Sequence, residues 1–313
     1  MGSEVVDEQL ASVEGPIADS PVPSTASELR RDARALDSTN RSGGRRDGTR
    51  GRREHPLLRI RGDLGLGWRI ALGVAGVAIV LAFWWVMASV MDNRSVLPTP
   101  PATLSAIRDL WRQGILTHDL WASVRRILIG YAASMAIGIV VGISIGTWAS
   151  IEALTEAPIG FLRYIPASAL TPVLLLWLGI GESPKVWLII VGTVFFNILM
   201  VADVARAVPR ELLNAAYTLG AGRFSVVRRV IARHSMPGII DVARINLAAA
   251  WLMLVVAELL AAQEGLAFQI VRAQRFRAVD TMFGLLIVFG VIGLVSDLGL
   301  RWLRNVSAPW ARP

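Results

Sequence analysis

The sequence predicts an all-α membrane protein with six transmembrane helices and a disordered N-terminal tail. Of its 313 residues, 54% are hydrophobic, and they come in long blocks rather than at the spacing of a soluble core. Several blocks approach or exceed roughly 18 to 20 residues, the length that crosses about 30 Å of hydrocarbon as a helix. The sequence shows no series of roughly ten-residue segments of alternating polarity, the pattern of membrane strands.

Residues 1–63 form the predicted tail. They are rich in Ser, Gly, Pro and Arg, include the run RRDGTRGRR at 45–53, and show no periodic apolar face. We therefore expect a disordered, Arg-rich cytoplasmic tail. No aromatic residue is interleaved with its arginines, which favours a solvated tail that sets topology over one that binds lipid or nucleic acid. The first apolar block begins near Trp68, too late for a signal peptide, so the first span should stay in the mature protein.

Six apolar spans are predicted at residues 68–91, 125–149, 159–179, 185–203, 237–262 and 281–303. Arginine is frequent in the tail and in the connection 204–236, and Lys and Arg favour the cytoplasmic side. We therefore expect a multi-pass protein of the cytoplasmic (inner) membrane, with the tail and the C-terminal residues 305–313 both cytoplasmic. The connections 92–124 and 263–280 then face outside, where three arginines run against the usual bias: Arg272, Arg275 and Arg277.

The outer connection after the first span should contain a short amphipathic helix. It follows a proline-rich stretch, and Gly114 supplies a stop. Leu104, Ile107 and Trp111 share its apolar face. The first span and this helix together make up residues 64–124.

The second span carries a small residue at every fourth position. Such a stripe lets another helix backbone approach closely in lipid. Its members are Gly130, Ser134, Gly138, Gly142 and Gly146.

Several kinds of chemistry are excluded by what the sequence lacks. It has no cysteine, and its three histidines show no ligand spacing, so we expect no metal site. The G-x-S-x-G match at 142–146 lies in the glycine-rich span and is a packing feature rather than a hydrolase nucleophile. The only lysine, Lys185, follows a proline, so the chain has no G-x-x-x-x-G-K-[ST] phosphate loop. Any ATP must be bound by another subunit.

Polar residues in the fifth span are candidates for a translocation path. Arg244, Trp251 and Glu258 are seven residues apart, and a seven-residue step drifts only about 20° on a straight helix, so they share one face. Ionisable groups in a span usually face a bundle interior or an aqueous path; placement of Glu258 at the outer interface is an equal alternative. Asp241 and Arg244 should form a structural pair at i, i+3.

The third span should be interrupted by proline. Prolines remove backbone donors and kink helices, so Tyr164 and Ser168, near Pro166, either face a cavity or lie beside a purely structural kink. Asn197 of the fourth span completes the candidate path.

The connection 204–236 contains a basic, amphipathic insert. Pro209 suits a helix start and Gly220 ends that helix, after which a second short helix should follow over about 224–233. The first helix has an apolar face made of Leu212, Leu213, Ala216 and Leu219. Such a face either covers the underside of the bundle or inserts into a groove on a partner.

This insert resembles the cytoplasmic motif of the membrane permease subunits of ATP-binding-cassette (ABC) importers, in the nitrate, sulfonate, taurine and bicarbonate branch. The family motif is E-A-A-x-x-x-G-x(9)-I-x-L-P. Here Asn214 replaces the glutamate, Ala215, Ala216 and Gly220 match, and Ala232-Arg233 replace Leu-Pro. The stretches LRYIPASALTPVLLLWLGIGES, VPRELLNAAYTLGAGR, AAAWLMLVVAELLAA and GLAFQIVRAQRF are also similar to that branch, so the resemblance covers about residues 96–304.

The resemblance implies a type I importer permease, with residues 125–304 as its core and coupling helices at about 209–233. Contacts to the ATPase would come from Glu211, Asn214, Ala215, Ala216, Gly220 and Arg223. The implied partners are two ABC ATPase subunits, which use ATP and Mg²⁺, an extracytoplasmic solute-binding protein, and a second permease copy in a homodimer. The chain would then be no enzyme and bind no cofactor itself, but form the path for a small anion.

The outer cations Arg272, Arg275 and Arg277 either attract an anion, contact acidic patches of the binding protein, or are plain solvated charges. Three other functions fit the sequence less well. An ion-gradient-driven secondary transporter would show paired broken helices and an inverted repeat. A membrane enzyme would show a constellation of reactive side chains within the spans. A scaffold would not explain polar residues along the third and fifth spans.

Overall fold

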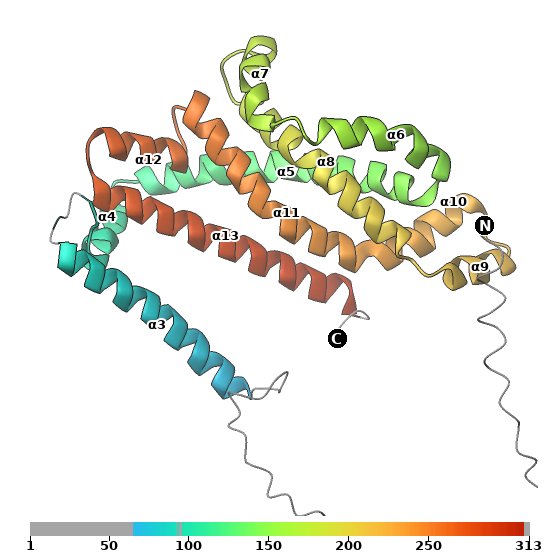
Figure 1. The fold of residues 1–313 in the computed structure, drawn as a ribbon, viewed down its shortest axis with the longest axis horizontal. Helices are drawn as coiled ribbons and strands as arrows, with labels where there is room; N and C mark the ends of the chain where they lie inside the picture. Colours follow the sequence, from blue (N-terminus) through green and yellow to red (C-terminus); the bar gives the residue numbers. More distant parts are fainter. Residues whose placement is uncertain (1–64, 92, 94–95, 310–313) are drawn as a thin grey trace, which may run out of the picture. The chain divides into compact units, whose positions relative to one another are not determined.

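The computed structural model describes residues 65–91, 93 and 96–309, which are almost entirely helical (Figure 1). The predicted tail at 1–63 and the last four residues lie outside the described residues. The chain divides into two units, residues 1–72 and 73–313. Of the first unit the structure describes only residues 65–72, at the start of α3 (Leu66–Met91).

The prediction of an all-α protein with six spans is confirmed. Among the described residues, five helical stretches are long and apolar enough to cross a membrane: α3, α5 (Ile115–Thr147), α8 (Ser183–Arg206), Arg223–Leu260, which includes most of α11 (Ala232–Ala261), and α13 (Val279–Ser307). The bent pair α6 (Ala149–Leu162) and α7 (Thr171–Leu178) is a sixth when it is counted as one span.

The third span is not the single helix predicted at 159–179. α6 already begins at Ala149, residues 163–166 are not helical, and the short 3₁₀ helix η2 (Ala167–Leu170) leads into α7. The two arms are bent by 79°. Pro166 accounts for the break, because proline lacks an amide donor and disfavours the helical conformation of the residue before it.

The small-residue stripe of α5 packs against α8, as predicted. A methyl group added to Gly142 would lie 2.7 Å from the carbonyl oxygen of Ile198, and one on Gly146 would lie 2.6 Å from that of Ala202. Only glycine allows the two backbones to come this close. The remaining space between α5, α8 and α11 is filled by one apolar core, and the Tyr131 hydroxyl of α5 donates to the Ala243 carbonyl of α11 at 2.6 Å.

Two short helices lie at one end of the second unit, each in contact with α13 (Figure 1). The expected amphipathic helix is α4 (Pro100–Arg112), followed by Gly114 at a φ of 74°. For residues 263–280 we predicted only a connection, but α12 (Leu266–Arg275) forms there. Leu266 of α12 and Leu285 of α13 are buried in a small core with Leu116 of α5.

At the opposite end, the predicted helical insert is present with one correction (Figure 1). α9 (Arg210–Thr218) is the first helix, and α10 (Arg223–Val226) follows the bend at Gly220. α10 is not part of a separate second helix: it continues through the π-helical turn η3 (Val227–Ile231) into α11. The prediction of a separate helix was wrong because Ile231 is buried in the same core as Ile239 of α11, which favours continuation past Pro237.

Candidate functional site

The α9–α10 segment exposes large apolar side chains to its surroundings. Leu219 is 88% and Phe224 74% exposed, and Leu212 is also exposed. Leu213 packs against the main core, so only part of the predicted apolar face covers the bundle. Leu213 thus covers the underside of the bundle, while Leu212 and Leu219 remain exposed and free to insert into a groove on a partner.

The predicted coupling residues lie on this segment. Ala216 is half-buried; the exposed ones are Glu211, Asn214, Ala215, Gly220 and Arg223. Gly220 has a φ of 79°, a left-handed conformation that side chains strongly disfavour, and its amide donates to the Tyr217 carbonyl at 2.9 Å. The bend between α9 and α10 thus depends on glycine.

The break in the third span opens onto a cavity. Tyr164 is 75% exposed and lines a space of about 350 Å³ together with Pro166, Phe195 and Met253. The alternative of a cavity therefore describes Tyr164, whereas Ser168 is not among the residues that line this space. Ser168 is exposed nearby, and its carbonyl accepts a hydrogen bond from the Thr171 hydroxyl at 2.8 Å.

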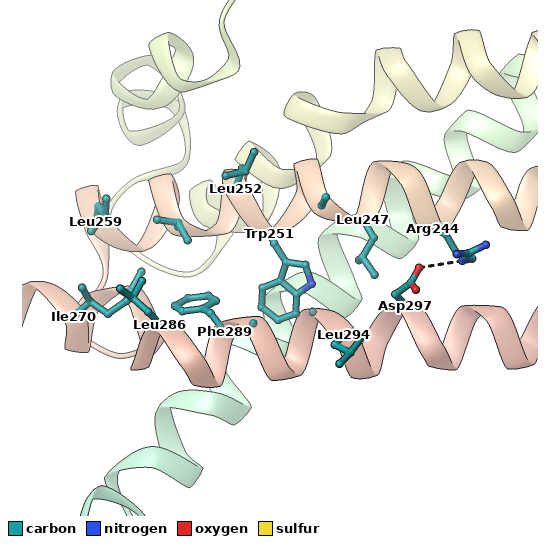
Figure 2. A pocket seen from close by; sticks show the side chains of 15 residues that line it. Arg244, Leu247, Trp251, Leu252, Leu259, Ile270, Leu286, Phe289, Leu294 and Asp297 are labelled. Carbon is teal, nitrogen blue, oxygen red and sulfur yellow. Dashed lines mark hydrogen bonds and ion pairs between the residues drawn. The ribbon is translucent and has the colours of Figure 1, made fainter. Parts of the chain in front are cut away.

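A groove of about 850 Å³ runs between α11 and α13 (Figure 2). Trp251 points from α11 toward Phe289 of α13, and the two rings meet edge to face with centroids 5.9 Å apart. Arg244 closes one end by donating to Asp297 at 3.0 Å, and its predicted pair with Asp241 is present at 3.1 Å. Arg244 and Trp251 thus do share one face.

Asn197 lies inside the packed bundle. Its side chain is fully buried, donates to the Ser134 hydroxyl at 2.9 Å and accepts from Asn246 at 2.8 Å. Thr193 donates to the same hydroxyl at 2.7 Å. These bonds join α5, α8 and α11. Asn197 therefore links three helices inside the bundle.

Glu258 is also buried, and it is not among the residues that line the groove. Its Oε1 accepts from Arg126 Nη1 at 2.9 Å and from the Ser123 hydroxyl at 2.6 Å. Its Oε2 accepts from the amide of Ala267 at 2.9 Å. The alternative of placing Glu258 at the outer interface does not describe this side chain, because none of it is exposed.

Arg126 joins Glu258 to two further carboxylates. Its side chain is fully buried, donates to both oxygens of Glu182 at 2.7 and 2.8 Å, and reaches Glu264 Oε1 at 3.1 Å. The ammonium of Lys185 donates to Glu182 at 2.6 Å. A bidentate guanidinium-carboxylate pair is among the stronger polar contacts in proteins. We call Arg126, Glu182, Glu258 and Glu264 the outer charge network, after the side of the membrane that the sequence predicts for this end.

The outer charge network lowers the pKa of Glu182, which lies just before α8. Hydrogen bonding to Arg126 is the largest cause, opposed by burial and aided by Lys185, and the pKa of this carboxyl falls from its ordinary 4.5 to about 2. Glu182 is thus ionised at any physiological pH.

Three side chains of α5 and α11 cap the start of α12. The amide of Gly265 donates to Asp119, that of Leu266 to Ser123, and that of Ala267 to Glu258, each at 2.9 Å. The first amides of a helix have no partner within the helix itself. These bonds hold the turn between α11 and α12 against α5.

Sequence reasoning did not find the outer charge network. Its residues come from three separate parts of the chain: Arg126 of α5, Glu182 just before α8, and Glu258 and Glu264 at the end of α11 and in the turn after it. The available signal was that Arg126 and Glu258 carry opposite charges at similar depth near the outer ends of two spans. In the described part of the chain, no group of three or more His, Asp or Glu side chains is placed to hold a metal ion.

The sequence is similar to a known family of membrane proteins. A family model described as "Binding-protein-dependent transport system inner membrane component" matches residues 134–312. A probable ABC transporter permease protein of Brucella melitensis biotype 1 is 34% identical over 77% of this chain and 97% of its own length. The taurine transport system permease protein TauC of Escherichia coli K12 is 32% identical over 78% of this chain and 91% of its own.

The fold is similar to that of a solved transporter. A chain of the MetNI methionine ABC transporter, in an inward-facing conformation, superposes with a TM-score of 0.56 at 19% identity. The match covers 62% of this chain and 96% of that one. At this identity the likeness concerns the fold alone.

Proposed function

Because this chain belongs to the family of binding-protein-dependent transport system inner membrane components, we propose that it forms the translocation path for a small anion in an ABC importer. It is a permease of the taurine, sulfonate and nitrate branch with the type I architecture. The anion class is inferred from the names of these relatives.

The proposed assembly contains two copies of this chain, two ABC ATPase subunits and an extracytoplasmic solute-binding protein. The ATPases bind ATP and Mg²⁺, while this chain binds no cofactor. Both termini of the chain lie in the cytoplasm. Closure of the ATPases moves α9 and shifts the spans between inward-open and outward-open states, which requires that ATP and solute each bind the two states with different affinity.

The observation that carries this proposal is the exposed apolar patch formed by Leu212, Leu219 and Phe224, which we call the coupling patch. The patch lies on α9 and at the start of α10, between two spans and at the end of the bundle opposite α12 (Figure 1). Large exposed apolar side chains in a connection between spans mark a candidate protein interface, and an amphipathic helix inserts such a face into a groove.

The test is co-purification with a candidate ABC ATPase subunit from the same organism. We expect Leu219→Asp to reduce ATPase recovery at least tenfold, because a charge placed in an apolar groove loses its hydration. Leu104→Asp on α4, at the other end of the bundle, is the matched control and should recover the ATPase normally. Full recovery with Leu219→Asp, and with the double variant that adds Phe224→Asp, contradicts the proposal.

The alternative of an ion-gradient-driven transporter gains one observation, the broken third span. However, both oxygens of the buried Glu258 are already engaged by Arg126, Ser123 and the Ala267 amide. Uptake into vesicles separates the two functions. The importer requires ATP and its ATPase, whereas a secondary transporter works with a proton or sodium gradient alone.

A further inference from the structure

The groove between α11 and α13 is apolar along nearly its whole length. Of the 15 described residues that line it, only Arg244 and Asp297 are ionisable, and these two pair with each other at one end (Figure 2). Between Arg244 and Leu259 the groove follows α11 for roughly 22 Å, at about 1.5 Å per residue. Both helices belong to candidate spans, so the groove lies at the depth of the membrane hydrocarbon.

The walls of the groove are open to the surroundings of the chain. A methyl group added to Gly290 or Gly293 on α13 would meet no described atom within 4 Å. A small anion would lose its hydration against these walls, whereas a hydrocarbon chain would gain dispersion contacts. Since the hydrocarbon core is about 30 Å thick, an acyl chain from one leaflet spans about 15 Å and fits the length of the groove. Exposed apolar side chains line both walls: Leu252, Leu259, Leu286 and Leu294.

A cluster of charged side chains lies at the Arg244 end of the groove, the end that the sequence predicts to be cytoplasmic. Asp297 lies 3.0 Å from Arg244 and 2.7 Å from Arg301. Asp241 lies 3.1 Å from Arg244 and 3.0 Å from Arg304. We call these five residues the inner charge cluster. Three arginines share two aspartates, so this part of the described chain carries one positive charge in excess.

Arg301 and Arg304 have donors that the inner charge cluster does not use. Each lies near its aspartate through Nε, and the Nη groups of both donate to no described residue. Nε of Arg304 is buried and makes no hydrogen bond even to Asp241. The two residues are three apart on α13 and therefore share one face of this helix. Paired N–H donors of a guanidinium match the oxygens of a phosphate group.

We propose that the α11–α13 groove binds an acyl chain of one anionic phospholipid, whose phosphodiester lies at Arg301 and Arg304. Asp297 connects the two parts of this site, because it lines the groove and contacts Arg301. One phosphodiester supplies the single negative charge that the inner charge cluster lacks. The lipid belongs to the leaflet at the C-terminal end of α13, where basic pockets between spans bind acidic headgroups.

The headgroup decides which phospholipid binds. An acyl chain gains little by exchanging lipid tails for the equally apolar walls of the groove. A zwitterionic phospholipid brings its own ammonium and leaves the excess charge of the inner charge cluster without a counterion. The site should therefore prefer an anionic phospholipid to a zwitterionic one with the same acyl chains.

The test titrates the full-length chain in detergent with two phospholipids of identical acyl chains and counts the bound lipids by native mass spectrometry. We expect the wild type to bind one phosphatidylglycerol, which is anionic, at least tenfold more tightly than the zwitterionic phosphatidylethanolamine. Arg301→Gln together with Arg304→Gln should abolish this difference. The matched control combines Arg228→Gln and Arg229→Gln, which remove the same charge from exposed positions of η3, and should keep it.

A second pair of variants tests the groove separately from the headgroup, and serves if the double variant of Arg301 and Arg304 does not fold. Gly293→Leu places a side chain in the open groove and should weaken phosphatidylglycerol about tenfold. Gly299→Leu, its control, also projects into space free of described atoms but lies outside this groove, so it should bind phosphatidylglycerol normally.

Equal affinity of the wild type for the two phospholipids overturns the inference, as does an equal loss of phosphatidylglycerol in both double arginine variants. If a second copy of the chain covers the groove instead, Gly293→Leu will reduce the mass of the dimer and leave lipid affinity unchanged, which also overturns it. The measurement uses neither ATP nor the ATPase, so its result is independent of whether the proposed function holds.

Discussion

At the scale of single residues, Arg126 shows how a charge is kept inside a span. All its donors are directed at oxygens of Glu182, Glu258 and Glu264. Forming a buried ion pair adds little net stability, because both charges lose their hydration, but removing one partner leaves an uncompensated charge.

We therefore expect Arg126→Met to lower the free energy of unfolding by about 3 to 5 kcal/mol. Glu182 would keep Lys185 and Arg125 as partners, but the buried carboxylate of Glu258 would lose its cation. Denaturant unfolding of the purified protein measures the effect. Arg112→Met, on the exposed side of α4, should change the free energy by less than about 0.5 kcal/mol. Equal stability of the two variants would contradict this role for Arg126.

Glu182 gives a pH dependence with a defined sign. Its folded-state pKa is about 2 and its ordinary value 4.5, so it binds its proton more weakly when folded. Its contribution to stability is therefore complete above pH 4.5 and decreases as the pH falls toward 2. Thermal midpoints of the wild type and Glu182→Gln should converge over this window. If their difference stays constant on acidification, the low pKa is wrong.

At the scale of helices, the α5–α8 contact depends on the absence of side chains. A methyl group on Gly146 would lie 2.6 Å from the Ala202 carbonyl, whereas one on Gly299 of α13 meets nothing within 4 Å. We expect Gly146→Ala to destabilise the protein by about 1 to 3 kcal/mol through overpacking. Gly299→Ala should be neutral or slightly stabilising in the same thermal unfolding measurement, because alanine favours a helix more than glycine does. Comparable losses in both variants would contradict the role of contact with α8.

The bend between α9 and α10 depends on one backbone conformation. Proline is fixed near a φ of −65° and lacks an amide hydrogen, while Gly220 has a φ of 79° and donates to Tyr217. We expect Gly220→Pro to abolish ATP-dependent uptake and leave membrane insertion intact, because the spans do not include this turn. Uptake is measured in vesicles, and insertion by the yield of monodisperse protein. Undiminished uptake would show that the bend does not transmit motion.

The elements were predictable where the signal is local, and less so where it is not. Long apolar blocks predicted the membrane spans, and small residues at every fourth position predicted the packing stripe of α5. Pro166 predicted the break near Tyr164, but the sequence did not predict that α6 and α7 are bent by 79° relative to each other. α12 and the outer charge network were missed because the partners of Glu258 come from distant parts of the chain, which no local pattern records.

At the scale of the molecule, the two ends of the bundle differ in character. One end has the apolar coupling patch; the other has α12 and the turn after it, where Arg272, Arg275 and Arg277 are exposed. We expect replacement of these three by Gln to weaken association with the binding protein about tenfold at low salt and less at high salt. Surface plasmon resonance on the reconstituted complex measures this. Unchanged docking and uptake would reduce the three to plain solvated charges.

One helical stretch connects these two ends. α10, η3 and α11 run without interruption from Arg223, beside the coupling patch, to the turn that Glu258 and Ser123 fasten against α5. The π-turn at Val227–Ile231 is its one stretch of wider hydrogen-bond spacing. In the proposed importer, a push of the ATPase on α10 would be divided at this turn, so that part bends the helix locally and the remainder displaces α11 along its axis. The stiffness of these five residues would then set how far closure of the ATPases opens the translocation path.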